Sequence, residues 1–266
     1  MDLSRSVITE DEDFVRFVAD IKRATSIDLS LYKENQMRRR LTTLRLKHGF
    51  SSFGEYFAAL MSEPRLRNEF LDRMTINVSE FWRNPNRWTV LADKFLPQML
   101  KQSGRLNIWS AACSTGEEPY TLAMILDACG ALERTSLLAT DIDDGVLAKA
   151  KEGSYLERSL RDVPADFRAK YFTAEDGAFR ISDKLKKAVR LQKQNLLKDE
   201  FATGFDLIVC RNVMIYFTEE AKHDLYGKFA RALKPGGILF VGSTEQIFSP
   251  GQYGLETADT FFYRRA

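Results

Sequence analysis

The stretch SAACSTGEEPY, residues 110–120, combines residue types that could hold a small charged ligand. Its small side chains let the backbone approach a ligand closely, and the first amides of the helix that follows are free to donate. A pyrophosphate favours such a helix start when no carboxylate opposes it. Glu117 and Glu118 stand on that first turn, so we expect a cationic ligand, such as a sulfonium with an α-amino group. The alternative is that both glutamates only favour the helix dipole.

Three later apolar runs end in side chains that suit the rest of a nucleoside. Asp141 stands roughly 20 to 25 residues after the first loop, where an acid binds a ribose diol. Asp143 is instead typical of a helix N-cap. Asn195 and Leu196 follow the third run and suit an adenine, and the segment 210–217, CRNVMIYF, follows the fourth. Because the carboxyl ends of parallel strands meet at one edge of a sheet, these residues predict one nucleoside site.

The elements that must position these residues fall into two halves. Up to about Leu100 the chain is predicted to be helical. Thr9 with Glu12 forms a capping box, a helix covers 33–47, and Ser52, Pro64 and Pro85 begin others. Pro97 is expected to disturb the end of the last one.

From Arg105 onward, short apolar runs alternate with helical segments, which is typical of a doubly wound, parallel α/β sheet. The expected strands are RLNIWSAA, SLLATD, VRLQKQN, FDLIVCRN and GILFVGS, and the expected helices cover 117–129, 145–151 and 219–233. KPGG at 234–237 predicts a turn before the last strand. Between the second and third strands, residues 152–190 interrupt the pattern: the first part is helical or irregular, and GAFRISDKLKKAVRLQ indicates short strands around a turn.

Composition excludes several classes of protein. With 266 residues, 44% of them hydrophobic, the chain can bury a large core, and its net charge of +2 gives no global attraction to nucleic acid. The 3 cysteines do not form a CxxC pair, so neither a disulfide framework nor a metal site is expected. No apolar run reaches the roughly 18 residues of a membrane span, and no signal peptide is evident. We therefore expect a cytoplasmic protein without membrane insertion.

Five motifs resemble those of the chemotaxis receptor glutamate methyltransferases, the CheR family. They are MTINVSEFWR, WSAACSTGEEPYTLAM, ATDID, QNLL and FDLIVCRNVMIYF, which begin at residues 74, 109, 139, 194 and 205. YKENQMRRRL and LKPGGILFVGSTE also match, so the resemblance covers nearly the whole chain. Trp82 stands where Phe is usual, and Ser79 replaces the commoner Thr but keeps the hydroxyl.

The resemblance implies an α/β fold of the class I S-adenosylmethionine-dependent methyltransferases. A small all-helical N-terminal domain would cover 1–75 and dock the receptor, and a linker with a helix, 76–104, would contribute cofactor contacts. The catalytic domain would cover 105–266, with a small β-subdomain inserted at about 153–190.

The resemblance also implies the reaction and the site. A methyl group would pass from S-adenosylmethionine to glutamate side chains on the cytoplasmic helices of chemoreceptors, leaving S-adenosylhomocysteine. Arg83 and Tyr216 match the residues nearest the methyl group. The motif does not distinguish Glu117 from Glu118. The implied cofactor contacts are Asn77, Ser79, Arg83, Ala111, Ala112, Glu117, Glu118, Asp141, Ile142, Asn195, Leu196, Arg211 and Asn212.

Receptor recognition is expected at a basic helix. Arg38, Arg39, Arg40 and Arg45 crowd residues 33–47, and the resemblance favours docking onto acidic receptor helices over a merely solvated basic face. Family members that bind the receptor's C-terminal tail carry a longer, glycine-framed loop where this chain has only TAEDGAF, residues 173–179. We therefore expect no tight binding of a tail peptide.

Two rival functions have their own signatures. Methyltransferases that act on amino groups or nucleobases usually carry a proline-containing turn after the fourth strand, where this chain has RNVMIYF. A non-catalytic adaptor could instead bind RNA or an acidic protein through the basic helix. Aromatic residues for base stacking are sparse there, and an adaptor needs no complete cofactor pocket.

Overall fold

The computed structural model describes residues 9–75 and 79–266, and the chain divides into two compact units. One unit, called here the helical unit, comprises the chain up to residue 76 together with Tyr216–Ala221. The other, called the sheet unit, comprises residues 77–215 and 222–266. None of the described helices combines the length and the apolar character that crossing a membrane requires.

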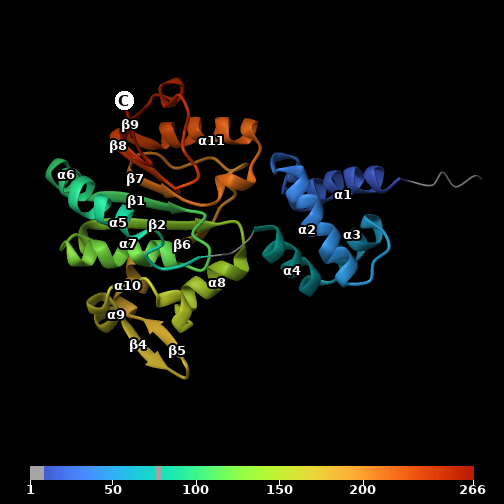
Figure 1. The fold of residues 1–266 in the computed structure, drawn as a ribbon, viewed down its shortest axis with the longest axis horizontal. Coiled ribbons are helices and arrows are strands. Elements are labelled where there is room, and N and C mark those ends of the chain that lie inside the picture. The colour runs from blue at the N-terminus through green and yellow to red at the C-terminus, as the bar shows by residue number, and fades with distance from the viewer. Residues whose placement is uncertain (1–8, 76–78) are drawn as a thin grey trace, which may run out of the picture. The chain divides into compact units, whose positions relative to one another are not determined.

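The helical unit is built from α1 (Glu10–Thr25), α2 (Glu34–Lys47), α3 (Phe53–Ser62) and α4 (Pro64–Thr75) (Figure 1). The predicted starts are confirmed: the Thr9 hydroxyl accepts from the Glu12 amide in a capping box, and the Ser52 hydroxyl accepts from the Glu55 amide. Aromatic side chains fill its core, with the Phe17 ring 5.1 Å from that of Phe53 and 6.0 Å from that of Tyr56. Burying such rings is the main source of its stability.

The segment Tyr216–Ala221 is held to the helical unit by backbone pairing. Tyr32 and Phe217 form an antiparallel bridge, and their rings lie 5.2 Å apart. The Lys33 amide donates to the Tyr216 carbonyl and the Thr218 amide to the Leu31 carbonyl, each at 2.9 Å. Tyr216 therefore has a fixed backbone position against the start of α2.

The sheet unit contains a sheet with the strand order β6-β2-β1-β7-β8-β10-β9. The strands are β1 (Leu106–Ala111), β2 (Thr135–Asp141), β6 (Val189–Lys193), β7 (Phe205–Cys210), β8 (Leu233–Val241), β9 (Leu255–Asp259) and β10 (Phe262–Arg265). The first five in this order pair in parallel, as the alternating pattern predicted. The order reverses direction between β1 and β7, which is where doubly wound sheets bind ligands.

Helices cover both faces of this sheet (Figure 1). They are α5 (Pro85–Val90), the π-helical turn Leu91–Phe95, α6 (Leu96–Gln102), α7 (Glu117–Ala128), α8 (Asp144–Glu152) and α11 (Glu219–Ala232). Side chains alternate between the faces along each strand. Ile108 of β1 belongs to the core that includes Trp88 and Leu122, whereas Trp109 packs against Phe229 of α11 at 5.7 Å.

The inserted region forms a small second sheet, with the order β3-β5-β4. Its elements are β3 (Ser154–Tyr155), α9 (Ala165–Tyr171), β4 (Phe172–Glu175), β5 (Ala178–Ile181) and α10 (Asp183–Ala188). Asp176 and Gly177 have φ values of 50° and 79°, the left-handed pair that a tight two-residue hairpin turn requires. The Asp127 carboxylate of α7 accepts from Lys170, Tyr171 and Lys184 and so anchors the insertion.

Pro97 disturbs its helix, as expected: the chain widens into the π-helical turn before it, and the helix then continues to Gln102. The local pattern misled the prediction at three places. KPGG does not precede the last predicted strand but lies within β8 and shifts its register: Leu233 pairs with Phe205, and Ile238 pairs with Leu207. Residues 183–188, expected between short strands, form α10. β9 and β10, which pair antiparallel at the edge, were not predicted.

Candidate functional site

The loop between β1 and α7 turns its backbone toward the sheet edge. Ala112, Ser114 and Gly116 have φ values of 59°, 48° and 97°, so left-handed residues alternate with others and make a concave run of amides. Gly116 is required on a second ground, because a Cβ there would lie 3.0 Å from Tyr120, Ala150 and Tyr155. The local sequence of small residues is thus explained by close packing as well as by backbone conformation.

Glu117 and Glu118 both lie inward at the start of α7. Glu117 is buried and accepts from the Thr115 hydroxyl at 2.6 Å and from Ser79. Burial raises the pKa of Glu117 above its usual range. Glu118 accepts from the Ser110 hydroxyl at 2.8 Å, and Arg211 Nη1 lies 3.8 Å from its Oε2. Either carboxylate could receive a cationic ligand, and the site contains both.

Burial also raises the pKa of the Glu118 carboxyl to about 7, against the opposing charges of Arg211 and Arg83. Near neutral pH the free protein therefore holds this group partly protonated, and a cationic ligand prefers its ionised form. We expect the affinity for S-adenosylmethionine to rise between about pH 6 and pH 8 and then to level off. Titration calorimetry across this range measures the slope.

Glu118→Gln is expected to remove that slope, because the side chain no longer titrates. Glu133→Gln serves as the control and should keep the slope, because Glu133 is exposed on the short 3-10 helix Leu132–Arg134. A group with a pKa of about 7 titrates between about pH 6 and pH 8. If the affinity of the wild-type protein for S-adenosylmethionine stays constant over this range, Glu118 does not have the proposed role.

Arg211 ties the end of β7 to the segment that carries Arg83. Its guanidinium is buried between the rings of Trp88 and Phe240, at 5.0 Å and 4.9 Å. Its Nη2 donates to the Arg83 carbonyl at 2.7 Å and to Asn84 Oδ1 at 2.9 Å. Trp88 Nε1 donates to the same Arg83 carbonyl at 3.1 Å. The backbone of Arg83 is therefore fixed from two sides, and its charge acts on Glu118.

Asp141 links the ends of β1 and β2. Its carboxylate is buried and accepts from the Ser114 amide at 2.8 Å and from the Asp143 amide at 3.1 Å. Each carboxylate oxygen keeps a further lone pair for a ligand hydroxyl. Asp143 accepts from the Gly145 amide at 2.7 Å, which confirms it as the N-cap of α8. Ile142 lies half-buried between the two acids.

Asn195 and Leu196 stand in a rigid turn after β6. Asn195 Oδ1 accepts from the Leu197 amide at 3.0 Å. Lys228 Nζ donates to the carbonyls of Leu196 and Asp199, at 2.9 Å and 2.6 Å. The Gln194 amide donates to the Asp141 carbonyl at 2.9 Å, so the ends of β6 and β2 are joined directly.

These residues fit S-adenosylmethionine. Among the described residues, five buried side-chain atoms have no hydrogen-bond partner, and two of them belong to the site: Ser114 Oγ in the loop after β1 and Arg211 Nε directly after β7. Paired carboxylates suit the charged methionine end, and Asp141 and Asn195 suit the nucleoside. Small side chains at Ala111 and Ala112 leave the backbone accessible. Asn77 lies outside the described residues.

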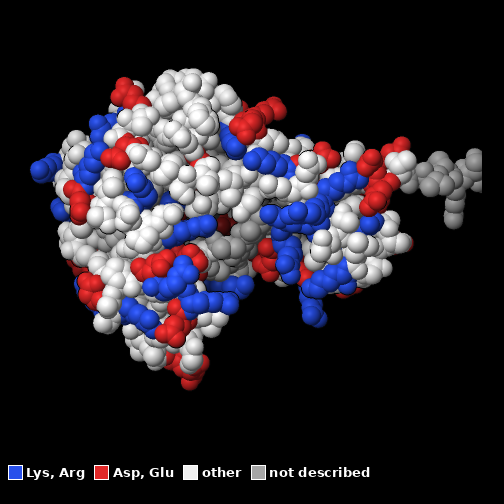
Figure 2. Space-filling model, viewed as in Figure 1, with Lys and Arg blue, Asp and Glu red and all other residues white. Residues whose placement is uncertain are grey.

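Tyr216 and the basic helix belong to the helical unit. The Arg40 guanidinium stacks over the Tyr216 ring at 5.4 Å, and burial lowers the pKa of Arg40. Arg39 is exposed, and Arg38 is half-buried with ion pairs to Asp11 and Glu34. Lys and Arg side chains gather over α2 on this unit in Figure 2.

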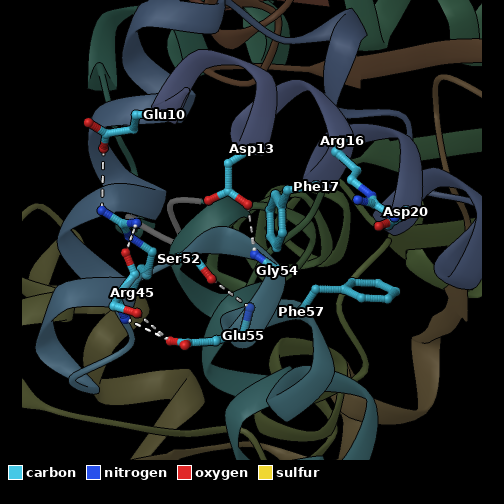
Figure 3. Close-up of a pocket in the computed structure, with 11 residues that line it drawn as sticks. Glu10, Asp13, Arg16, Phe17, Asp20, Arg45, Ser52, Gly54, Glu55 and Phe57 are labelled. Atoms are coloured by element: carbon cyan, nitrogen blue, oxygen red, sulfur yellow. Dashed lines mark hydrogen bonds and ion pairs between the residues drawn. The ribbon is translucent and has the colours of Figure 1, made fainter. Parts of the chain in front are cut away.

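Arg45 differs from the sequence-based expectation of a docking residue. It is 6% exposed and stacks on the Phe53 ring at 4.7 Å. It donates to the Ser51 carbonyl at 2.8 Å and to Glu10 at 3.3 Å (Figure 3). It therefore braces α2 against α1 and α3 inside the helical unit. Arg38 and Arg45 do not form one accessible basic face.

Ser110, Thr115 and Trp88 were not predicted as site residues. Ser110 and Thr115 lie inside the motif, but only their contacts to Glu118 and Glu117 reveal their role. Trp88 lies in α5, five residues after Arg83, and no role was predicted for it from the sequence.

Comparisons with known proteins cover both units. Residues 77–262 match the family described as CheR methyltransferase, SAM binding domain, and residues 12–75 match CheR methyltransferase, all-alpha domain. The chain is 44% identical over 254 residues to the chemotaxis protein methyltransferase of Listeria monocytogenes, covering 95% of this chain and 97% of that one. It is 36% identical to the one of Borreliella burgdorferi, covering 90% and 89%. It is 34% identical to chemotaxis protein methyltransferase 1 of Pseudomonas aeruginosa, covering 88% and 90%.

Proposed function

Since this chain belongs to the CheR methyltransferase family, we propose that it methylates glutamate side chains of chemoreceptors with S-adenosylmethionine, giving methyl esters for chemotactic adaptation. The observation that carries the proposal is the convergence of Glu117, Glu118, Asp141 and Asn195 at the carboxyl edge of one parallel sheet, within the part that matches the SAM binding domain. We place this activity in the cytoplasm, where receptors present their signalling helices.

The chemistry needs placement more than proton transfer. S-adenosylmethionine, when bound, supplies a methyl group on a positively charged sulfur. A glutamate carboxylate has an unperturbed pKa of about 4.3, so at neutral pH it is already the nucleophile and no general base is required. The protein must hold the carboxylate oxygen about 3–3.5 Å from the carbon it attacks.

Arg83 is proposed to orient the incoming carboxylate. A guanidinium can hold one carboxylate oxygen by a charge-assisted hydrogen bond and leave the other free to attack. The backbone contacts from Arg211 and Trp88 support this role, because they fix the point from which the side chain extends. The Tyr216 hydroxyl is proposed to set the angle of attack.

Binding of S-adenosylhomocysteine separates this enzyme from a non-catalytic adaptor. The proposal expects a dissociation constant in the low micromolar range, about −8 kcal/mol, by calorimetry. An adaptor that uses only the basic helix has no reason to bind the nucleoside. Failure to bind below about 1 mM would leave the adaptor as the better account.

Receptor docking is proposed for the exposed part of α2. Charge reversal at Arg39, which is exposed, is expected to raise the KM for receptor fragments in a salt-dependent manner and to leave kcat unchanged, because an exposed charge acts mainly on encounter. Steady-state kinetics at two salt concentrations measure this. Arg45→Glu is the matched comparison on the same helix, and it should lower the melting temperature, because it buries an uncompensated charge. A KM indifferent to the Arg39 reversal would rule out docking at α2.

A receptor tail peptide is proposed not to bind tightly. Tail capture works by strand addition to an exposed edge, with affinity from backbone hydrogen bonds. The turn at Asp176 and Gly177 has only two residues, so the edge strand β4 has no long loop beside it. This short turn supports the proposal. Titration of a tail pentapeptide is expected to give no heat signal at micromolar concentrations. A dissociation constant of about 1 μM would overturn the proposal.

A further inference from the structure

The loop Asn212–Ile215, which links the end of β7 to Tyr216, wraps around one buried carboxylate. Glu245 Oε2 accepts from the Asn212 amide at 2.6 Å and from the Gly242 amide at 2.9 Å. Its Oε1 accepts from the Met214 amide at 2.7 Å and from the Ile215 amide at 3.3 Å. Glu245 is 5% exposed, so these amides have no ready exchange with water. One side chain thus fixes the backbone of the whole loop.

The contact is built into the sequence on both sides. Gly242 leaves β8 beside the end of β7, where Val241 pairs with Cys210. A Cβ at Gly242 would lie 2.5 Å from Glu245 Oε2 and 2.8 Å from the Asn212 amide, so only glycine allows the approach. The Glu245 amide donates to the Gly242 carbonyl at 3.0 Å and closes the turn that brings the carboxylate back.

The loop that Glu245 holds carries residues of the site. Asn212 has a φ of 61°, a left-handed conformation that asparagine adopts more readily than other non-glycine residues. Arg211, which precedes it, contacts Glu118 and the Arg83 carbonyl. Any change in the course of Asn212–Ile215 therefore displaces Arg211 and its contacts to Glu118 and to the Arg83 carbonyl.

We propose that Glu245 is a positioning residue for methyl transfer: its carboxylate shapes the loop Asn212–Ile215 and thereby sets Arg211 and Asn212 at the cofactor. This inference rests on the proposed function for its turnover readout. Glu245 itself needs no contact with either substrate. It acts through the backbone amides that it accepts from, each of which would be costly to leave unpaired.

Glu245→Gln tests the proposal with the smallest change in shape. The amide keeps one acceptor oxygen, but its NH₂ group must face amides that also donate, so part of the loop loses its partner. We expect kcat to fall about tenfold or more. We also expect the affinity for S-adenosylhomocysteine, measured by calorimetry, to fall several-fold. Glu245→Asp keeps both carboxylate oxygens on a shorter side chain. It should therefore retain more of the wild-type kcat and of the affinity for S-adenosylhomocysteine than Glu245→Gln does.

Asp206→Asn is the matched control. Asp206 is also buried, accepts from the Asn107 amide at 2.7 Å and from Lys234 at 2.7 Å, and stands at the opposite end of β7. The Asp206→Asn variant should have a lower melting temperature, as the Glu245→Gln variant does, but its kcat and cofactor affinity should be unchanged.

Two outcomes decide the matter. A Glu245→Gln protein that loses thermal stability like Asp206→Asn but keeps wild-type kcat and cofactor affinity overturns the positioning role. If the wild-type protein methylates no receptor, the proposed function fails, and the cofactor affinity of Glu245→Gln still decides the inference independently.

Discussion

Arg83→Ala is expected to lower kcat about a hundredfold while changing the affinity for S-adenosylhomocysteine by less than about threefold. The reason is that Arg83 is proposed to orient the substrate carboxylate, and a misplacement of about 1 Å at the reacting atoms can cost two orders of magnitude. Single-turnover methyl transfer and calorimetry measure the two quantities separately.

Arg87→Ala is the control for this experiment. Arg87 lies four residues along the same segment, is half-buried, and contacts Asp259 and the Phe261 ring, away from Glu118. It should leave kcat unchanged. Equal losses of turnover and cofactor affinity in Arg83→Ala would reduce Arg83 to a binding residue.

Tyr216→Phe should lower kcat less than Arg83→Ala does, because the ring keeps its packing on Arg40 and only the hydroxyl is lost.

Asp141→Ala is expected to weaken S-adenosylmethionine binding by about 1.5–3 kcal/mol, or roughly 10- to 150-fold. The ribose diol loses its acceptor, and the Ser114 and Asp143 amides lose theirs, so the loop after β1 is released as well. Calorimetry measures the change.

Asp143→Ala separates the ligand contact from general damage. Asp143 accepts from the Gly145 amide as the N-cap of α8, so losing this cap should cost about 1 kcal/mol of stability. Cofactor affinity should be unchanged. An Asp141→Ala protein with wild-type affinity would remove Asp141 from the site.

Local signals predicted those parts of the fold that local physics determines. Thr9 and Ser52 begin helices because their hydroxyls meet the amides of Glu12 and Glu55, which lie three residues away. The parallel strands are apolar runs because both of their faces are covered. β9 and β10 were not predicted because their pairing depends on β8: the ring of Phe262 in β10 stacks on that of Phe240 in β8 at 4.2 Å. Such a partner cannot be read from the strand itself.

The site shows the same division. Motif spacing predicted Glu117, Glu118, Asp141 and Arg211, and the structure brings them to one sheet edge. The burial of Arg45 was not predicted, because a charge pattern along a helix does not reveal that Ser51 and Phe53 cover that position. Glu245 escaped because its partners lie about thirty residues earlier in the chain, at Asn212 and Met214.

Transfer of a radiolabelled methyl group from S-adenosylmethionine onto chemoreceptor cytoplasmic fragments tests the central claim most directly. Methyl esters of carboxylates are released as methanol by mild base, whereas methylated amines keep their label. The account predicts label on the receptor that is lost in base, that requires receptor glutamates, and that disappears with Arg83→Ala. Base-stable label, or no label on any receptor fragment from a protein that binds S-adenosylhomocysteine, would contradict it.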